Sequence, residues 1–160
     1  MSKVFGYPEF DASGEMILTT YGGDYAAMLM DVRVYKMKAG ETRSFCRPGE
    51  EIAVLLLSGA VTFRYEGREH AAARKDVFTE GPWCVHAAGG VEIGVSVETE
   101  TEILVQCTKN ERTFPAKLYR PEDAPWKYSC KGKFGGVAQR QVNTIFDHDI
   151  CPESNMVLGE

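Results

Sequence analysis

Apolar and polar residues alternate along most of the chain between residues 15 and 110. The alternation is strictest in four stretches, residues 28–35, 61–66, 91–98 and 103–108. A period of two places neighbouring side chains on opposite faces of a sheet, so each stretch predicts a β-strand. A fifth stretch, residues 52–57, is apolar at every position, which is typical of a strand that is covered on both faces.

Glycine-containing pairs separate the predicted strands. They are Gly22-Gly23, Ala39-Gly40, Pro48-Gly49, Ser58-Gly59, Glu66-Gly67, Gly81-Pro82 and Gly89-Gly90. Turn signals at a spacing of roughly 8–12 residues are typical of an all-β sandwich or barrel. Only residues 24–30 resemble a helix, and that segment is short. Residues 15–110 are therefore predicted to form one antiparallel β-sandwich or barrel.

The sequence changes character after Lys109. Residues 111–123 combine two prolines with mixed charges, residues 131–136 read KGKFGG, and apolar residues return between 142 and 158. These shifts predict three segments: a barrel over 1–112, a connector over 113–141, and the incomplete start of a second unit over 142–160. An apolar tail needs a surface to cover it, either the barrel of its own chain or a second copy. We therefore expect a homodimer or a higher homo-oligomer, with this tail packed across the interface or added to a partner sheet. The alternative is a frayed, disordered tail.

Composition restricts the classes of partner. The 160 residues carry 18 Lys and Arg against 23 Asp and Glu, which gives a net charge of −5 and an isoelectric point of about 5.3. Nucleic-acid binding needs clustered cations, so no nucleic-acid partner is expected. The longest apolar run, residues 52–57, is far shorter than the roughly 20 residues of a membrane span, so no membrane partner is expected.

The cysteines and the N-terminal segment predict a cytoplasmic location. The five cysteines are odd in number and form no CxxC pair, as expected for reduced thiols rather than a disulfide framework or a zinc ribbon. Residues 1–18 carry several charges and lack the apolar stretch of a signal peptide.

The segment Gly40–Gly59 resembles the first conserved motif of cupins: a glycine, a polar run, a glutamate pair, an apolar strand and a glycine turn. In metal-binding cupins the polar run supplies two histidines and then a glutamate to one ion. The comparable positions here hold Cys46, Arg47 and Pro48, followed by Glu50 and Glu51. A thiol and a carboxylate make a poor divalent-metal site, so no metal is expected in this chain. A small anion or a sugar acid near Arg47 is the expected ligand.

The segment Gly81–Gly90, GPWCVHAAGG, resembles the second cupin motif, a Pro/Gly turn with a late histidine. We therefore predict a candidate pocket at the barrel mouth, made of Cys46, Arg47, Glu51 and His86. A lone histidine is more often a packed or surface residue than a ligand, and that structural role is the alternative for His86. Cys84 and His86 share a strand face, but no third orienting group for nucleophilic catalysis is evident, so no catalytic residue is predicted.

Residues 114–145 resemble the connector between the two cupin halves of 5-deoxy-glucuronate isomerases. The shared stretches are Pro115–Leu118, Arg120–Asp123, Lys131–Gly136 and Arg140–Val142. Residues 77–82 and 153–160 fit the same family. One departure is visible, because the family usually continues with His-Asn where this chain has Asn143-Thr144. The resemblance covers nearly the whole chain and implies a cupin-type, jelly-roll-like barrel that is the N-terminal half of a bicupin.

The resemblance also implies a reaction, the aldose–ketose isomerisation of a sugar acid in myo-inositol catabolism. Such a reaction moves a proton from a carbon beside a carbonyl to its neighbour while a metal or an acid stabilises the enediolate. In this family the histidines that bind the divalent metal belong to the second half, so the chain alone is expected to hold no cofactor and to be inactive. The alternative is a stand-alone, non-catalytic cupin used for small-molecule binding or assembly. A His-x-His strand encoded after Glu160 would distinguish the two.

Overall fold

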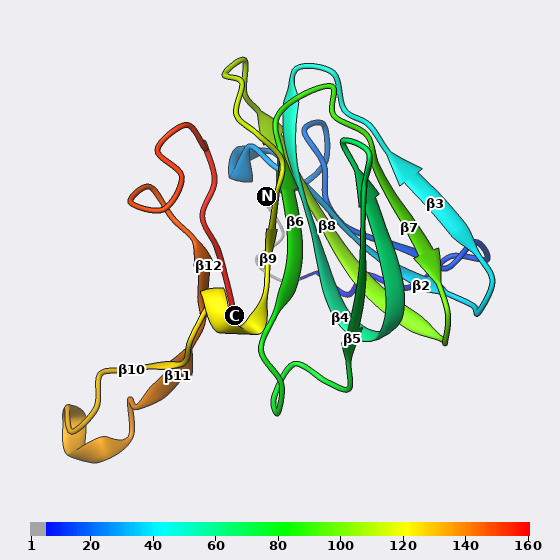
Figure 1. The fold of residues 1–160 in the computed structure, drawn as a ribbon. Coiled ribbons are helices and arrows are strands. Elements are labelled where there is room, and N and C mark those ends of the chain that lie inside the picture. Colours follow the sequence, from blue (N-terminus) through cyan, green and yellow to red (C-terminus); the bar gives the residue numbers. More distant parts are fainter. Residues whose placement is uncertain (1–5) are drawn as a thin grey trace.

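The computed structural model describes residues 6–160 and confirms the all-β prediction (Figure 1). The helical elements of this range are three short 3-10 turns, η1 (Ala26–Met28), η2 (Pro121–Asp123) and η3 (Phe134–Gly136). No helix in residues 6–160 is both long and apolar enough to cross a membrane. Residues 1–5, which begin the predicted barrel segment and the stretch searched for a signal peptide, lie outside the described residues.

The strands follow one another with short connections. In chain order they are β1 (Glu15–Thr19), β2 (Asp31–Met37), β3 (Thr42–Phe45), β4 (Glu50–Tyr65), β5 (Arg68–Arg74), β6 (Trp83–Ala87), β7 (Ile93–Val97), β8 (Thr101–Lys109), β9 (Lys117–Tyr119), β10 (Lys127–Ser129), β11 (Arg140–Val142), β12 (Thr144–Phe146) and β13 (Leu158–Gly159). The strictly alternating stretches of the sequence thus lie largely in β2, β4, β7 and β8.

Nine strands form one antiparallel sheet that folds over into two layers. The first layer has the order β1-β2-β8-β4-β6-β9, and the second layer contains β3, β7, the C-terminal half of β4, and β5. The 16-residue strand β4 takes part in both layers, and its register against β8 shifts between Leu56 and Ser58. The next residue, Gly59, has φ +105°, and a Cβ there would lie 2.1 Å from the hydroxyl oxygen of Thr101. Glycine at this position therefore lets β4 pass from the first layer to the second close beside β8.

The main hydrophobic core lies between the two layers. Alternate residues of β4, Ile52, Val54 and Leu56, point into it together with side chains from β2, β6, β7 and β8. The intervening residues Ala53 and Leu55 face the other way and are equally buried. The prediction that residues 52–57 form a strand covered on both faces is therefore largely confirmed.

The C-terminal segment, residues 143–160, covers the outer face of the first layer (Figure 1). Its strands β12 and β13 pair antiparallel, and Ile145, Phe146, Met156 and Leu158 are buried there against residues of β4, β6 and β9. The barrel of the same chain thus covers most of the apolar tail, although Val157 is 61% exposed. The homodimer stays a prediction, and the tail does not require it for burial.

A buried ion pair holds the last residue of this segment. Arg74, at the end of β5, is 2% exposed and donates hydrogen bonds from Nη1 to the Leu56 carbonyl at 2.9 Å and from Nη2 to the Glu80 carbonyl at 2.8 Å. The same two nitrogens bind both carboxylate oxygens of Glu160. A planar guanidinium suits this bidentate geometry. The contact joins β5, in the second layer, to residue Glu160 of the C-terminal segment.

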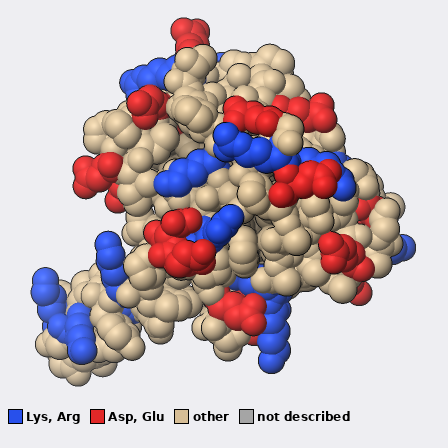
Figure 2. Space-filling view, in the orientation of Figure 1, with Lys and Arg blue, Asp and Glu red and all other residues tan. Residues whose placement is uncertain are grey.

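The predicted connector, residues 113–141, contains several short strands. After β9, strands β10 and β11 form a hairpin that extends away from the barrel (Figure 1). Residues 127–142 carry four cations, Lys127, Lys131, Lys133 and Arg140, and no acidic residue. Figure 2 shows such cations at the outer end of this hairpin, while acidic groups are spread over the barrel.

Candidate functional site

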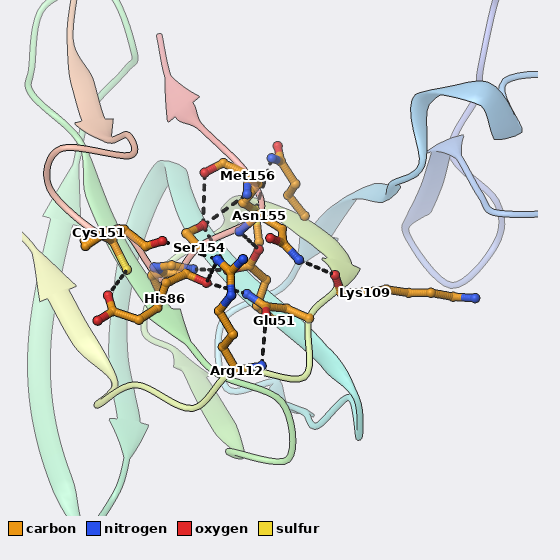
Figure 3. A network of polar contacts seen from close by, with 12 residues as sticks. Glu51, His86, Lys109, Arg112, Cys151, Ser154, Asn155 and Met156 are labelled. Atoms are coloured by element: carbon orange, nitrogen blue, oxygen red, sulfur yellow. Dashed lines mark hydrogen bonds and ion pairs between the residues drawn. The ribbon is translucent and has the colours of Figure 1, made fainter.

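Glu51 is the centre of a buried polar network between the barrel and the C-terminal segment (Figure 3). It lies in β4 next to Ile52, whose side chain enters the core, so the carboxylate of Glu51 points to the outer face. The residue is 0% exposed. A carboxylate is costly to bury unless it is hydrogen-bonded, so its partners determine how this part of the molecule folds.

Three donors surround that carboxylate. The backbone N–H of Asn155 donates to Oε1 at 2.6 Å, and the hydroxyl of Ser154 lies 2.9 Å from Oε2. His86 Nε2 is 3.0 Å from the same Oε2. When the carboxylate is ionised it only accepts hydrogen bonds, and Nε2 of His86 is then the donor in this contact. The network thus fixes both the ring of His86 and the loop at residues 154–156.

His86 is held on its ring faces as well as at Nε2. It lies in β6 opposite Ala53 of β4, and it is 1% exposed. The ring of Phe146 stacks on the imidazole with a centroid distance of 4.0 Å and an angle of 5°, and Phe114 lies tilted at 4.8 Å. Among residues 6–160, Nδ1 has no protein partner. In a neutral imidazole that carries its proton on Nε2, this nitrogen is an acceptor.

The structure brings together two of the four predicted pocket residues. Glu51 and His86 are in contact, but Arg47 Nη2 lies 3.9 Å from Asp31 and the thiol of Cys46 donates to the Gly90 carbonyl at 3.5 Å. That the four residues form one pocket stays a prediction, but His86 does not point into the main core. Its neighbours Val85 and Ala87 point into the main core, so His86 projects from the opposite side of the sheet.

A second polar cluster, which the sequence did not indicate, surrounds Arg33 of β2. Its guanidinium is 2.6 Å from Asp31 and 2.7 Å from Glu15, and the Tyr35 hydroxyl donates to Glu15 at 2.8 Å. The hydrogen bond from Arg33 lowers the pKa of Glu15, while burial raises the pKa of Tyr35 to about 12. Arg47 adjoins this cluster through Asp31. Asp31 thus lies between Arg33 and Arg47, the residue expected to attract an anion.

The cysteines differ in burial, and we expect their reactivity to differ accordingly. Cys46 is exposed, whereas Cys84 and Cys107 are 0% exposed, and burial raises the pKa of Cys107 to about 12 and that of Cys84 further. The thiolate is the reactive form and its fraction grows as pH approaches the pKa, so at pH 8 the two buried thiols are almost fully protonated. Iodoacetamide at pH 8 should modify Cys46 first and Cys84 and Cys107 last, as measured by peptide mass spectrometry.

Urea-unfolded chain serves as the control for this experiment, because all five thiols should then react at similar rates. Modification of Cys107 as fast as Cys46 in the folded chain would contradict the burial described here.

Metal-binding side chains do not gather in the described part of the chain: residues 6–160 hold no group of three or more His, Cys, Asp and Glu suited to an ion. Glu51 and His86 are two candidate ligands, but Nε2 of His86 and Oε2 of Glu51 already contact each other. The residues present therefore do not fit a divalent-metal centre of the kind that cupin enzymes use. That this chain binds no metal stays a prediction.

Comparison with known proteins identifies relatives. The model of the KduI/IolB family matches residues 7–160. An IolB-like protein from Salmonella typhimurium LT2 is similar in structure, with a TM-score of 0.67 and 20% identity, over 75% of this chain and 45% of that one. Protein YlbA from Escherichia coli matches with a TM-score of 0.59 and 11% identity, over 92% of this chain and 57% of that one.

The comparison with curated proteins found no match. This chain spans less than half the length of the Salmonella protein. At such identities the structural matches bear on the fold alone, and with the strand topology they confirm the predicted antiparallel cupin-type barrel. That the barrel is one half of a bicupin stays a prediction.

Proposed function

The chain belongs to the KduI/IolB family, and we propose that it supplies the N-terminal cupin barrel of a sugar-acid isomerase that resembles 5-deoxy-glucuronate isomerase. The family match carries this proposal because it extends over residues 7–160, through the barrel, the hairpin connector and the docked tail. A barrel alone does not need that connector for stability. The implied setting is myo-inositol catabolism in the cytoplasm.

The proposed reaction interconverts an aldose acid and its keto isomer. A base removes a proton from the carbon beside the carbonyl, the enediolate is held, and the proton returns to the neighbouring carbon. We assign these steps, and the divalent metal of the family, to a second barrel. The part of this chain is to fold the first barrel and to fix residues 142–160 on it through Glu51 and Arg74. We also propose that the complete assembly is a homo-oligomer.

A non-catalytic cupin is the second candidate, and the cluster at Arg33 favours it. The guanidinium is paired with both Asp31 and Glu15, so charged groups of this part of the barrel satisfy one another. Such mutual pairing is typical of a structural ion-pair network, which shifts pKa values without taking part in catalysis. In this reading the chain binds a small molecule or serves assembly without chemistry of its own.

The purified 160-residue chain should show no turnover of 5-deoxy-glucuronate, with or without added Mn²⁺, Zn²⁺ or Fe²⁺, because we place the metal ligands in a second barrel. Addition of the separately purified second half of a family isomerase should produce turnover, and that half alone should be less active. The measurement is the appearance of the keto isomer by proton NMR.

Turnover by the 160-residue chain alone would contradict the assignment of the chemistry to a second barrel. If adding the chain leaves the activity of the second half unchanged, the non-catalytic cupin becomes the better description.

A further inference from the structure

A cavity of about 370 Å³ lies beside His86, outside the barrel. Its walls come from the β6–β9 edge, the start of the connector and the tail loop, and include His86, Thr113, Phe114, Lys117, Tyr119 and Glu153. Figure 3 shows Cys151, another wall residue of the tail loop, beyond the ring of His86 from Glu51. The cavity therefore exists only where the tail is docked on the barrel.

The polar groups of this cavity are already positioned. His86 and Lys117 are directly opposite each other in the β6–β9 pair, and the ammonium group of Lys117 lies 4.3 Å above the centre of the Tyr119 ring. His86 cannot turn away, because Glu51 binds Nε2 and Phe146 stacks on the ring. Its Nδ1 makes no hydrogen bond within residues 6–160. In a neutral ring that is protonated at Nε2, Nδ1 is an acceptor, so it is available to a hydroxyl group of a ligand.

The mixture of groups indicates the class of ligand. Nδ1 of His86 and the carboxylate of Glu153 accept hydrogen bonds, Lys117 donates them, and the hydroxyl of Thr113 does both. Phe114 and Tyr119 supply aromatic surface. Lys117 and Glu153 balance each other in charge, so the cavity favours neither an anion nor a cation.

We propose that this cavity is a binding site for a neutral polyhydroxylated ring, such as a pyranose or a cyclitol. Hydroxyl groups of the ring donate to His86 Nδ1 and Glu153 and accept from Lys117, while its C–H surface packs on the aromatic rings. Binding at this cavity does not depend on isomerase activity.

Binding is tested on the 160-residue chain by NMR titration with three probes of similar size: D-glucose, myo-inositol and D-glucuronate. We expect saturable binding of at least one neutral probe, with a shift of the ¹⁵N resonance of His86 Nδ1 as it accepts a hydrogen bond. Replacement Lys117→Met should weaken that binding about tenfold, which corresponds to about 1.4 kcal/mol. The matched control, Lys127→Met on the distant hairpin strand β10, should leave it unchanged.

Lys117 is exposed, so its replacement leaves the Glu51 network and the fold intact. Three results would overturn the proposal: no saturable binding of either neutral probe, binding that Lys117→Met does not weaken, or binding without a change at His86 Nδ1. Preference for D-glucuronate over both neutral probes would overturn the assignment of an uncharged ligand.

Discussion

Replacement of Glu51 by alanine should lower the free energy of unfolding by about 3–5 kcal/mol. The carboxylate is 0% exposed and accepts hydrogen bonds from His86, Ser154 and the backbone of Asn155. Alanine removes the acceptor for all three donors and leaves them in a space closed to most water. Urea unfolding followed by circular dichroism measures the loss, and chymotrypsin cleavage after Phe146 should become faster because the tail is released.

Glu50→Ala is the matched control for Glu51. The two glutamates are neighbours in β4, but Oε2 of Glu50 is buried without a partner among the described residues. Its removal should therefore change stability by less than about 1 kcal/mol. Equal losses in the two variants would show that the network around Glu51 does not hold the tail.

Replacement of Arg74 by methionine should also cost about 3–5 kcal/mol, because it removes the partner of the partly buried Glu160 carboxylate and the hydrogen bonds to two carbonyl groups. Methionine retains the apolar stem of arginine, so the loss measures the guanidinium group. The effect should appear in urea unfolding. Replacement Glu160→Gln should produce a smaller loss, since the amide oxygen still accepts a hydrogen bond from Arg74.

Arg64→Met is the control for the effect of burial. Arg64 also pairs with a carboxylate, that of Glu69 at 2.5 Å, but the two side chains are 47% and 64% exposed. Exposed pairs contribute about 0–1 kcal/mol, so this variant should be nearly as stable as the unaltered chain. A loss as large as that of Arg74→Met would contradict the distinction between the two ion pairs.

The sequence predicted the barrel well because local patterns determine it. Alternation located most of β2, β4, β7 and β8, and the glycine pairs located the turns between strands. The hairpin β10–β11 was missed because its strands are three residues each and largely exposed, so no apolar alternation marks them. The position of the tail was left open because both surfaces that were considered for it satisfy the same apolar pattern.

The site was predicted only in part, for a reason that is visible at His86. The resemblance to cupin motifs placed this residue at the barrel mouth, while the alternation of Val85 and Ala87 around it indicates the opposite face. Ser154 and Asn155 were missed altogether. They lie 103 and 104 residues from Glu51, and only the folded tail brings them to it.

Hydrogen exchange at the amide of Asn155 is the most direct test of whether the tail is docked on the barrel. This N–H donates to the buried carboxylate of Glu51, so in the unaltered chain it should exchange at least about a hundredfold more slowly than an unstructured amide. In Glu51→Ala that protection should disappear while the amides of β4 and β8 keep theirs. Exchange of the Asn155 amide at the unstructured rate in the unaltered chain would contradict the docking of residues 143–160 on the barrel.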